Sequence, residues 1–206
     1  MSLSAIPAAT VDDLFEQRTA AARDFVDQAE NVAATCHAMA LRFHRGGKLV
    51  VFGNGGPSTD AQHVAVEFMH PVIVGKRALP AVSLTADVAT LTGVANQSGL
   101  AEVFAHQIRL LADQADIALG ISTAGNCENV LRGLEVAHQL GLLTVALVGG
   151  DGGALARTPQ VDHVLRASSE DVLVVKEVHV TAYHVLWELV HVLFDQPGLL
   201  GAGAVA

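Results

Sequence analysis

Two spacings of hydrophobic residues divide the chain. From residue 10 to residue 44, apolar side chains such as Leu14, Phe25 and Met39 recur among polar ones, which predicts one or two amphipathic helices. A short apolar run bounded by glycines follows at residues 49–52, as is typical of a buried parallel strand. Similar runs predict four more strands, at residues 81–84, 117–121, 143–148 and 163–166.

Helical segments separate these runs and are expected near residues 57–69, 88–94, 101–111, 127–140 and 172–194. Parallel neighbours need a crossover connection, so this order predicts an α/β fold: a doubly wound, five-stranded parallel sheet flanked by helices in a flavodoxin-like three-layer arrangement. We expect the sheet domain at residues 46–197. An N-terminal helical extension at residues 1–45 is expected to pack in the oligomer, and residues 198–206 to form a flexible tail.

The last predicted helix, residues 172–194, carries apolar side chains on nearly every face. A helix of this kind is expected to be buried all round, and one α/β layer covers only part of it. Charged residues make up only 16% of the chain, which is little for the surface of a monomer. Both features favour burial of part of the surface between subunits.

Composition narrows the class of protein. The formal net charge of −9 argues against direct binding of nucleic acid, which needs a basic surface. Only Cys36 and Cys127 are present, without metal-site spacing, so a disulfide framework is not expected and a reducing compartment fits. No apolar run approaches the roughly 18 to 20 residues that cross a bilayer, and the N-terminus does not resemble a secretory signal. These features predict a cytoplasmic protein with no membrane partner.

Two glycine-containing turns are candidates for anion binding. The first, GNGG at residues 53–56, follows a predicted strand and opens a helix whose N–H groups can hold an anion. Taken alone, it is equally well explained as a tight connection. The second turn, ISTAGN, adds the hydroxyls of Ser122 and Thr123 and the amide of Asn126 at the same edge of the sheet. Together the turns suggest a phosphate ester or a polyol as ligand.

Several motifs in order resemble one family. The stretches GNGGPSTDAQHVAVEF, LTGVANQSGL, ISTAGN, VALVGGDGG and KEVHVTAYH are similar to the sugar-isomerase (SIS) domain, and specifically to its phosphoheptose isomerase branch, over about residues 10–195. The resemblance implies that residues 46–197 form an SIS domain in a homotetramer with active sites at subunit interfaces. It also implies conversion of sedoheptulose 7-phosphate to a heptose 7-phosphate through an enediol.

The resemblance assigns the acid–base pair. Glu67 matches the family's catalytic glutamate and His184 its catalytic histidine, and both types of group suit proton transfer near neutral pH. The alternatives are a solvated helix face for Glu67 and a satisfied core histidine for His184. No cofactor is implied to be required. Zinc is possible, because some members hold it among residues matching His63, Glu67, His184 and a glutamine, but Lys176 replaces that glutamine here.

The expected substrate site departs from the family pattern. Serines that usually hold the phosphate are replaced by Pro57, Ala124 and Cys127, and Ser122 remains. We expect the phosphorylated sugar to contact Asn54, Gly55, Gly56, Ser58, Gln97, Ser122, Thr123, Asn126 and Lys176. For Lys176, an ion pair with a neighbouring glutamate is an equal alternative. A non-catalytic protein that binds a sugar phosphate, or that associates with the replication initiator as a regulator, also stays open.

Overall fold

The sheet predicted from the sequence is confirmed in the computed structural model, which describes residues 7–196, 198 and 200. All neighbouring strands are parallel, and their order is β2-β1-β3-β4-β5. The strands are β1 (Leu49–Gly53), β2 (Ala81–Ser83), β3 (Ile117–Ser122), β4 (Leu143–Gly149) and β5 (His163–Ala167). The tail predicted at residues 198–206 lies outside the described residues except for residues 198 and 200.

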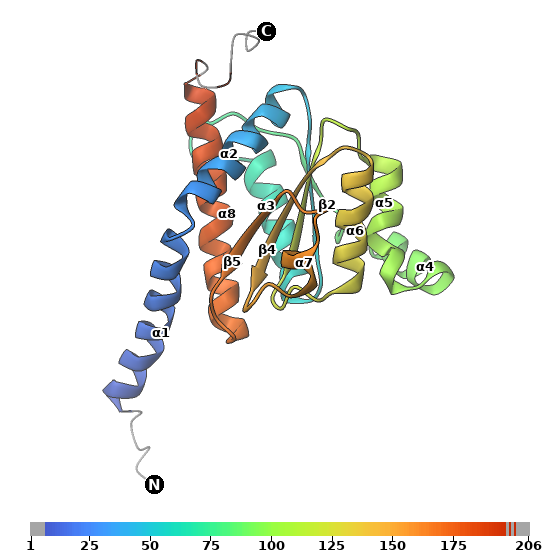
Figure 1. Ribbon diagram of the computed structural model, residues 1–206. Coiled ribbons are helices and arrows are strands. Elements are labelled where there is room, and N and C mark those ends of the chain that lie inside the picture. The colour runs from blue at the N-terminus through green and yellow to red at the C-terminus, as the bar shows by residue number, and fades with distance from the viewer. Residues whose placement is uncertain (1–6, 197, 199, 201–206) are drawn as a thin grey trace.

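Helices connect the strands and cover both faces of the sheet (Figure 1). They are α1 (Ala8–Val26), α2 (Ala29–His44), α3 (Gly56–Met69), α4 (Val88–Ser98), a 3₁₀ turn η1 (Leu100–Glu102), α5 (Val103–Leu111), α6 (Glu128–Gln139), α7 (Gly153–Arg157) and α8 (Val172–Asp195). The sequence pattern missed α7 and did not separate η1 from α5, because segments this short do not show helical periodicity.

Alternation along each strand divides the core into two layers. In β1, Leu49 and Val51 pack on one side of the sheet with α1, α2, α3 and α8, whereas Val50 and Phe52 pack on the other with α4 to α7. All five residues of β1 are buried, as expected of a strand covered on both faces. The short β2 ends the sheet on one side and β5 ends it on the other.

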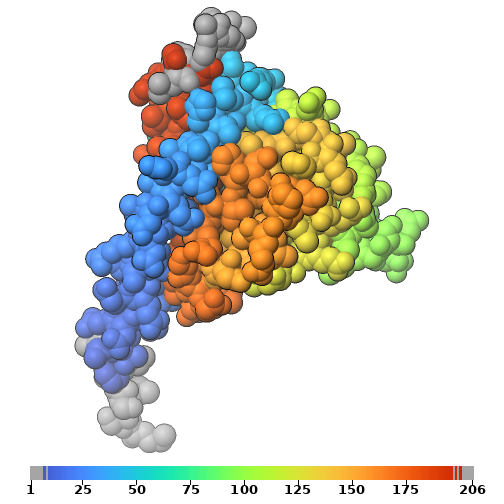
Figure 2. Space-filling view, viewed as in Figure 1, coloured from blue at the N-terminus to red at the C-terminus, as the bar shows by residue number. Residues whose placement is uncertain are grey.

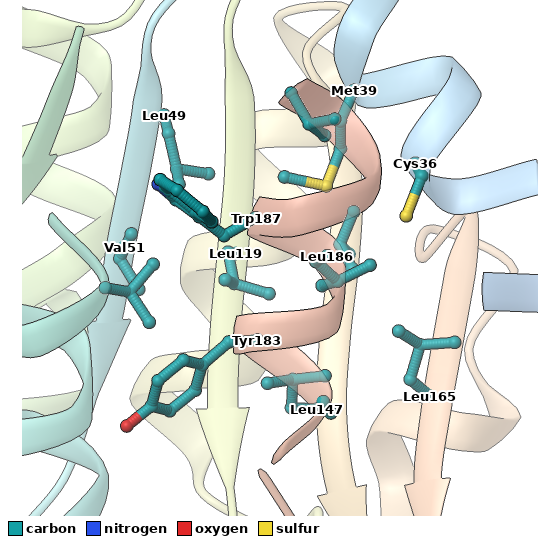
Figure 3. Packing of buried hydrophobic residues seen from close by; sticks show 14 of the residues in the cluster. Cys36, Met39, Leu49, Val51, Leu119, Leu147, Leu165, Tyr183, Leu186 and Trp187 are labelled. Atoms are coloured by element: carbon teal, nitrogen blue, oxygen red, sulfur yellow. The ribbon is translucent and has the colours of Figure 1, made fainter. Parts of the chain in front are cut away.

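Helix α8 fills the first layer. Its side chains Tyr183, Leu186 and Trp187 project toward β1, β3 and β4, as Figure 3 shows. The two large aromatic residues of α8 thus reach the sheet beside α3. This packing fixes the position of α8 relative to α3, and burying a large aromatic side chain contributes about 1.5 to 3 kcal/mol each.

Within one chain, α8 is covered only in part, as expected of a single α/β layer, and its burial between subunits stays a prediction. Val172 and Leu173 at its start are 59% and 61% exposed, and Val192 near its end is 39% exposed. Helix α1 is also largely exposed and extends away from the body of the molecule (Figure 2). Its apolar residues Leu14 and Phe15 are 48% and 68% exposed.

No helix within residues 7–196 is long and apolar enough to cross a membrane.

Candidate functional site

The first glycine turn is shaped by close backbone contacts. A Cβ at Gly53 would lie 2.7 Å from the carbonyl oxygen of Ile121, so only glycine allows β1 and β3 to end this close together. Gly55 has a φ of 63°, in the region that favours glycine. Helix α3 then begins at Gly56, and the hydroxyl of Ser58 donates to the Gly55 carbonyl at 2.6 Å. The first turn of α3, with its N–H groups, therefore lies at the carboxyl end of β1.

The second turn uses its polar side chains within the fold. The buried hydroxyl of Ser122 accepts from the Gly125 N–H at 3.0 Å and donates toward Cys127 Sγ at 3.4 Å. Asn126 accepts from the Ala154 N–H at 2.9 Å through its side-chain oxygen. These bonds fold residues 122–127 into a compact loop at the start of α6.

A pair of asparagines joins the first turn to α6. Asn54 and Asn129 exchange two hydrogen bonds of 2.7 and 2.9 Å. A cleft of about 290 Å³ lies beside this pair, lined by Gly53, Asn54, Gly55, Ser58, Thr85, Leu91, Thr92, Ala95, Leu100, Val103 and Phe104. A smaller cleft of about 140 Å³ includes Thr123 and Asn126 in its lining. Gln97 is exposed on α4 and is not part of the lining of either cleft.

Helices α3 and α8 bring four titratable side chains together. His63 Nε2 lies 3.2 Å from Glu67 Oε1, and the Tyr183 hydroxyl lies 2.9 Å from His63 Nδ1. The His184 ring is 5.3 Å from the His63 ring and 4.9 Å from the Tyr183 ring, edge-on in both cases. Burial, with smaller contributions from Asp60 and Glu67, raises the pKa of the Tyr183 phenol. The structure thus brings together the proposed acid–base residues Glu67 and His184.

Comparison with known proteins places the chain in a family. The model of the SIS domain matches residues 15–149. Phosphoheptose isomerases from Solidesulfovibrio magneticus and Thermodesulfovibrio yellowstonii are 42% and 40% identical to it, covering 90% and 77% of this chain and 90% and 79% of their own lengths. The chain belongs to the SIS domain family, in its phosphoheptose isomerase branch. The solved structure of the phosphoheptose isomerase from Francisella tularensis superimposes with a TM-score of 0.83 at 33% identity, over 89% of this chain and 97% of that one. The phosphoheptose isomerase from Neisseria gonorrhoeae gives 0.81 at 29% identity, over 88% and 97%.

Three side chains of this SIS domain can hold a metal ion. One ligand atom from each of His63, Glu67 and His184 lies within 4.8 Å of the other two. Two imidazoles and a carboxylate are donors that zinc accepts, and a fourth ligand completes its usual tetrahedron. Lys176 does not supply it, because a charged ammonium has no lone pair. The donor set therefore fits zinc at three positions.

Lys176 lies under the first turn of α3. Its ammonium donates to Asp60 Oδ1 at 2.6 Å and to the Gly56 carbonyl at 3.4 Å. The partner in the ion pair is thus an aspartate of α3, whereas the sequence analysis considered a glutamate. The Asp60 side chain is 7% exposed and that of Lys176 is 35% exposed. This ion pair connects α8 to the turn that precedes α3.

His179, one turn beyond Lys176, is 1% exposed. Among the described residues, its two ring nitrogens and Asp60 Oδ2 have no hydrogen-bond partner within bonding geometry. Burial, and to a lesser extent the Lys176 charge, lowers the pKa of His179, although the Val148 backbone and Asp60 act in the opposite direction. An uncharged imidazole is therefore the form that this SIS domain buries.

Sequence reasoning missed the residues that hold this cluster in place. Tyr183 binds His63, and Trp187 Nε1 donates to the Glu67 carbonyl at 2.9 Å. The only signal in the sequence was their type: they are the single tyrosine and the single tryptophan of a chain with 4% aromatic residues, spaced four apart on one helix. Such spacing places two side chains on one face, but it does not say what that face touches.

Proposed function

We propose that this SIS-domain protein is an aldose–ketose isomerase acting on a phosphorylated sugar. The substrate that the resemblance implies is sedoheptulose 7-phosphate, converted to a heptose 7-phosphate. The observation that carries the proposal is the meeting of Glu67 with His63 and His184 between α3 and α8. The names of the relatives that are 42% and 40% identical support the same reaction class.

The chemistry requires two groups that move protons. Glu67 takes a proton from the carbon beside the carbonyl, which leaves an enediol, and then returns a proton to the neighbouring carbon. His184 moves the proton that the oxygens exchange as the carbonyl shifts by one carbon. A positioned acid or base contributes roughly 10²- to 10⁴-fold to the rate of such a step.

The phosphate is proposed to bind at the two glycine turns. The substrate contacts are Asn54, Gly55, Gly56, Ser58, Gln97, Ser122, Thr123, Asn126 and Lys176. Backbone N–H groups at the start of α3 donate most of the hydrogen bonds to the phosphate, since Pro57, Ala124 and Cys127 carry no hydroxyl. The Ser122 hydroxyl contributes by exchanging its contact with Cys127 for a phosphate oxygen.

Zinc is not required by this proposal, but it fits the cluster. His63, Glu67 and His184 would hold the ion, which would polarise the substrate carbonyl. The protein's own task in either case is the same: to hold Glu67 against the substrate carbon and to exclude water from it.

We also propose that the protein is a cytoplasmic homotetramer. The N-terminal extension at residues 1–45 then packs between subunits, which would cover the exposed apolar residues of α1 and those after α3. The largest of these exposures are Phe15 at 68%, Val72 at 73% and Val74 at 101%. Apolar patches of this kind mark surfaces that meet a partner.

A second function is supported by the loss of hydroxyls from the turns. A protein that binds a sugar phosphate without converting it would also keep the cleft beside Asn54, and its role would be regulatory, for example in association with the replication initiator. The ion pair between Lys176 and Asp60 favours this alternative. Among the described residues, Lys176 is the one cation close to Gly56, and its charge is already paired with Asp60. Ligand binding without turnover would distinguish this function from an isomerase.

The test measures isomerisation and exchange of the substrate proton with deuterated solvent. We expect sedoheptulose 7-phosphate to be converted by the wild type, and Glu67→Gln to lose at least about 10²-fold in kcat. Glu135→Gln, which removes a carboxylate from the ion pair with Arg132 on α6, serves as the control and keeps full activity. Thermal stabilisation by the sugar phosphate with no conversion and no deuterium uptake would instead establish the regulatory function.

A further inference from the structure

A continuous line of hydrogen bonds runs from the core to Glu67. The Tyr183 hydroxyl lies 2.9 Å from His63 Nδ1, and His63 Nε2 lies 3.2 Å from Glu67 Oε1. Tyr183 is 2% exposed, whereas the His63 side chain is 42% exposed and that of Glu67 is 16% exposed. The line therefore begins at a buried phenol and ends at the carboxylate proposed to act as the base.

The atoms at the two ends determine where the proton of a neutral His63 ring lies. An ionised carboxylate only accepts hydrogen bonds, so Glu67 needs a proton on Nε2. His63 Nδ1 then presents a lone pair, and the Tyr183 hydroxyl satisfies it as donor. The opposite tautomer would set the lone pair of Nε2 against the Glu67 oxygen.

We propose that Tyr183 is a positioning residue that selects the Nε2–H tautomer of His63 and so keeps His63 as a hydrogen-bond donor to Glu67. The donor holds the Glu67 carboxylate in one orientation. The tautomer assignment stands on geometry alone, whereas its consequence for turnover rests on the proposed isomerase function.

A phenol differs from the usual partner of a metal-binding histidine. A carboxylate or a carbonyl can only accept, which fixes the proton on the near nitrogen and leaves the far nitrogen free for the metal. A hydroxyl can also donate, so Tyr183 can satisfy a bare His63 Nδ1, which a carboxylate or a carbonyl cannot do. Without a metal ion, the acceptor Glu67 and the donor Tyr183 therefore favour the same tautomer of His63, with the proton on Nε2.

The contacts of the Tyr183 ring allow a selective test. The ring packs edge-on against His63 at 5.4 Å and against His184 at 4.9 Å, and Tyr183→Phe keeps these contacts while removing the oxygen. Thr35→Val is the matched control. It removes another buried hydroxyl, which donates to the Asn31 carbonyl at 2.7 Å within α2. Thermal unfolding of both variants checks that the fold is kept.

The first measurement is long-range ¹H–¹⁵N NMR of histidine-labelled protein treated with chelator. The chain has 10 histidines, so the His63 signals are assigned as those absent from His63→Asn. We expect a proton on Nε2 and a bare Nδ1 in the wild type, and a growing share of the Nδ1–H form in Tyr183→Phe. A proton on Nδ1 in the wild type, protons on both nitrogens, or identical spectra in the two proteins would overturn the proposal.

The second measurement separates binding from turnover. The loss of one hydrogen bond in the line should lower kcat by about fivefold in Tyr183→Phe, with KM unchanged within about twofold. Thr35→Val should change neither. An unchanged kcat in Tyr183→Phe would overturn the positioning role. If the wild type converts no sugar phosphate, the proposed function fails, and the NMR result still decides the tautomer.

Discussion

Replacing Lys176 by Met tests what the ion pair beneath α3 contributes to stability. The substitution keeps the length and apolar stem of the side chain but removes the charge. Asp60 is left with a carboxylate whose side chain is 7% exposed and whose Oδ2 has no partner among the described residues. Breaking a buried ion pair from one side costs about 3 to 5 kcal/mol, and the partial exposure of Lys176 places the expected loss near 3 kcal/mol.

The assay is urea unfolding followed by the fluorescence of Trp187, at one protein concentration throughout. The control is Lys76→Met. Its ion pair with Asp195 has nearly the same length, 2.7 Å, but the Asp195 side chain is 65% exposed. We expect the control to lose less than about 1 kcal/mol. Equal losses in the two variants would refute the reasoning.

Three further predictions follow from single residues. Because the folded pKa of His179 lies below its ordinary 6.5, the unfolded chain binds the extra proton as pH falls through that value, so stability is lost below it. Replacing His179 by Gln should flatten the fall of the urea midpoint between pH 7 and pH 5. Burial raises the pKa of the Cys36 thiol to about 12, so a thiol reagent at pH 8 should modify Cys127 alone in the folded protein and both cysteines in urea. Gly125→Ala should lower the unfolding free energy by more than about 2 kcal/mol, since φ is 66° and the new Cβ would collide with the Gly152 carbonyl.

The strands and long helices were predictable because their signals are local. Each strand is an apolar run that ends at a turn, and each long helix shows its periodicity within its own residues. The five predicted strands match the observed ones within two residues at either end. The short α7 was missed, since a helix of five residues is too short to show helical periodicity.

The candidate site was predictable in part, and for a different reason. Glu67, His184 and His63 all came from resemblance to a family. No spacing predicted that Tyr183 would reach His63, 120 positions away. Gln97 also came from this resemblance; its side chain is exposed on α4, and its contact with the substrate stays a prediction.

The sequence by itself determined the order of strands and helices, the two glycine turns and the family, because periodicity and backbone freedom are properties of neighbouring residues. Only the tertiary structure decided which face of α8 meets α3. That docking pairs Asp60 with Lys176, and the Glu67 carbonyl with Trp187, by the packing of two helices on one face of the sheet. Such pairs depend on how distant segments fill a common layer, which no local pattern specifies.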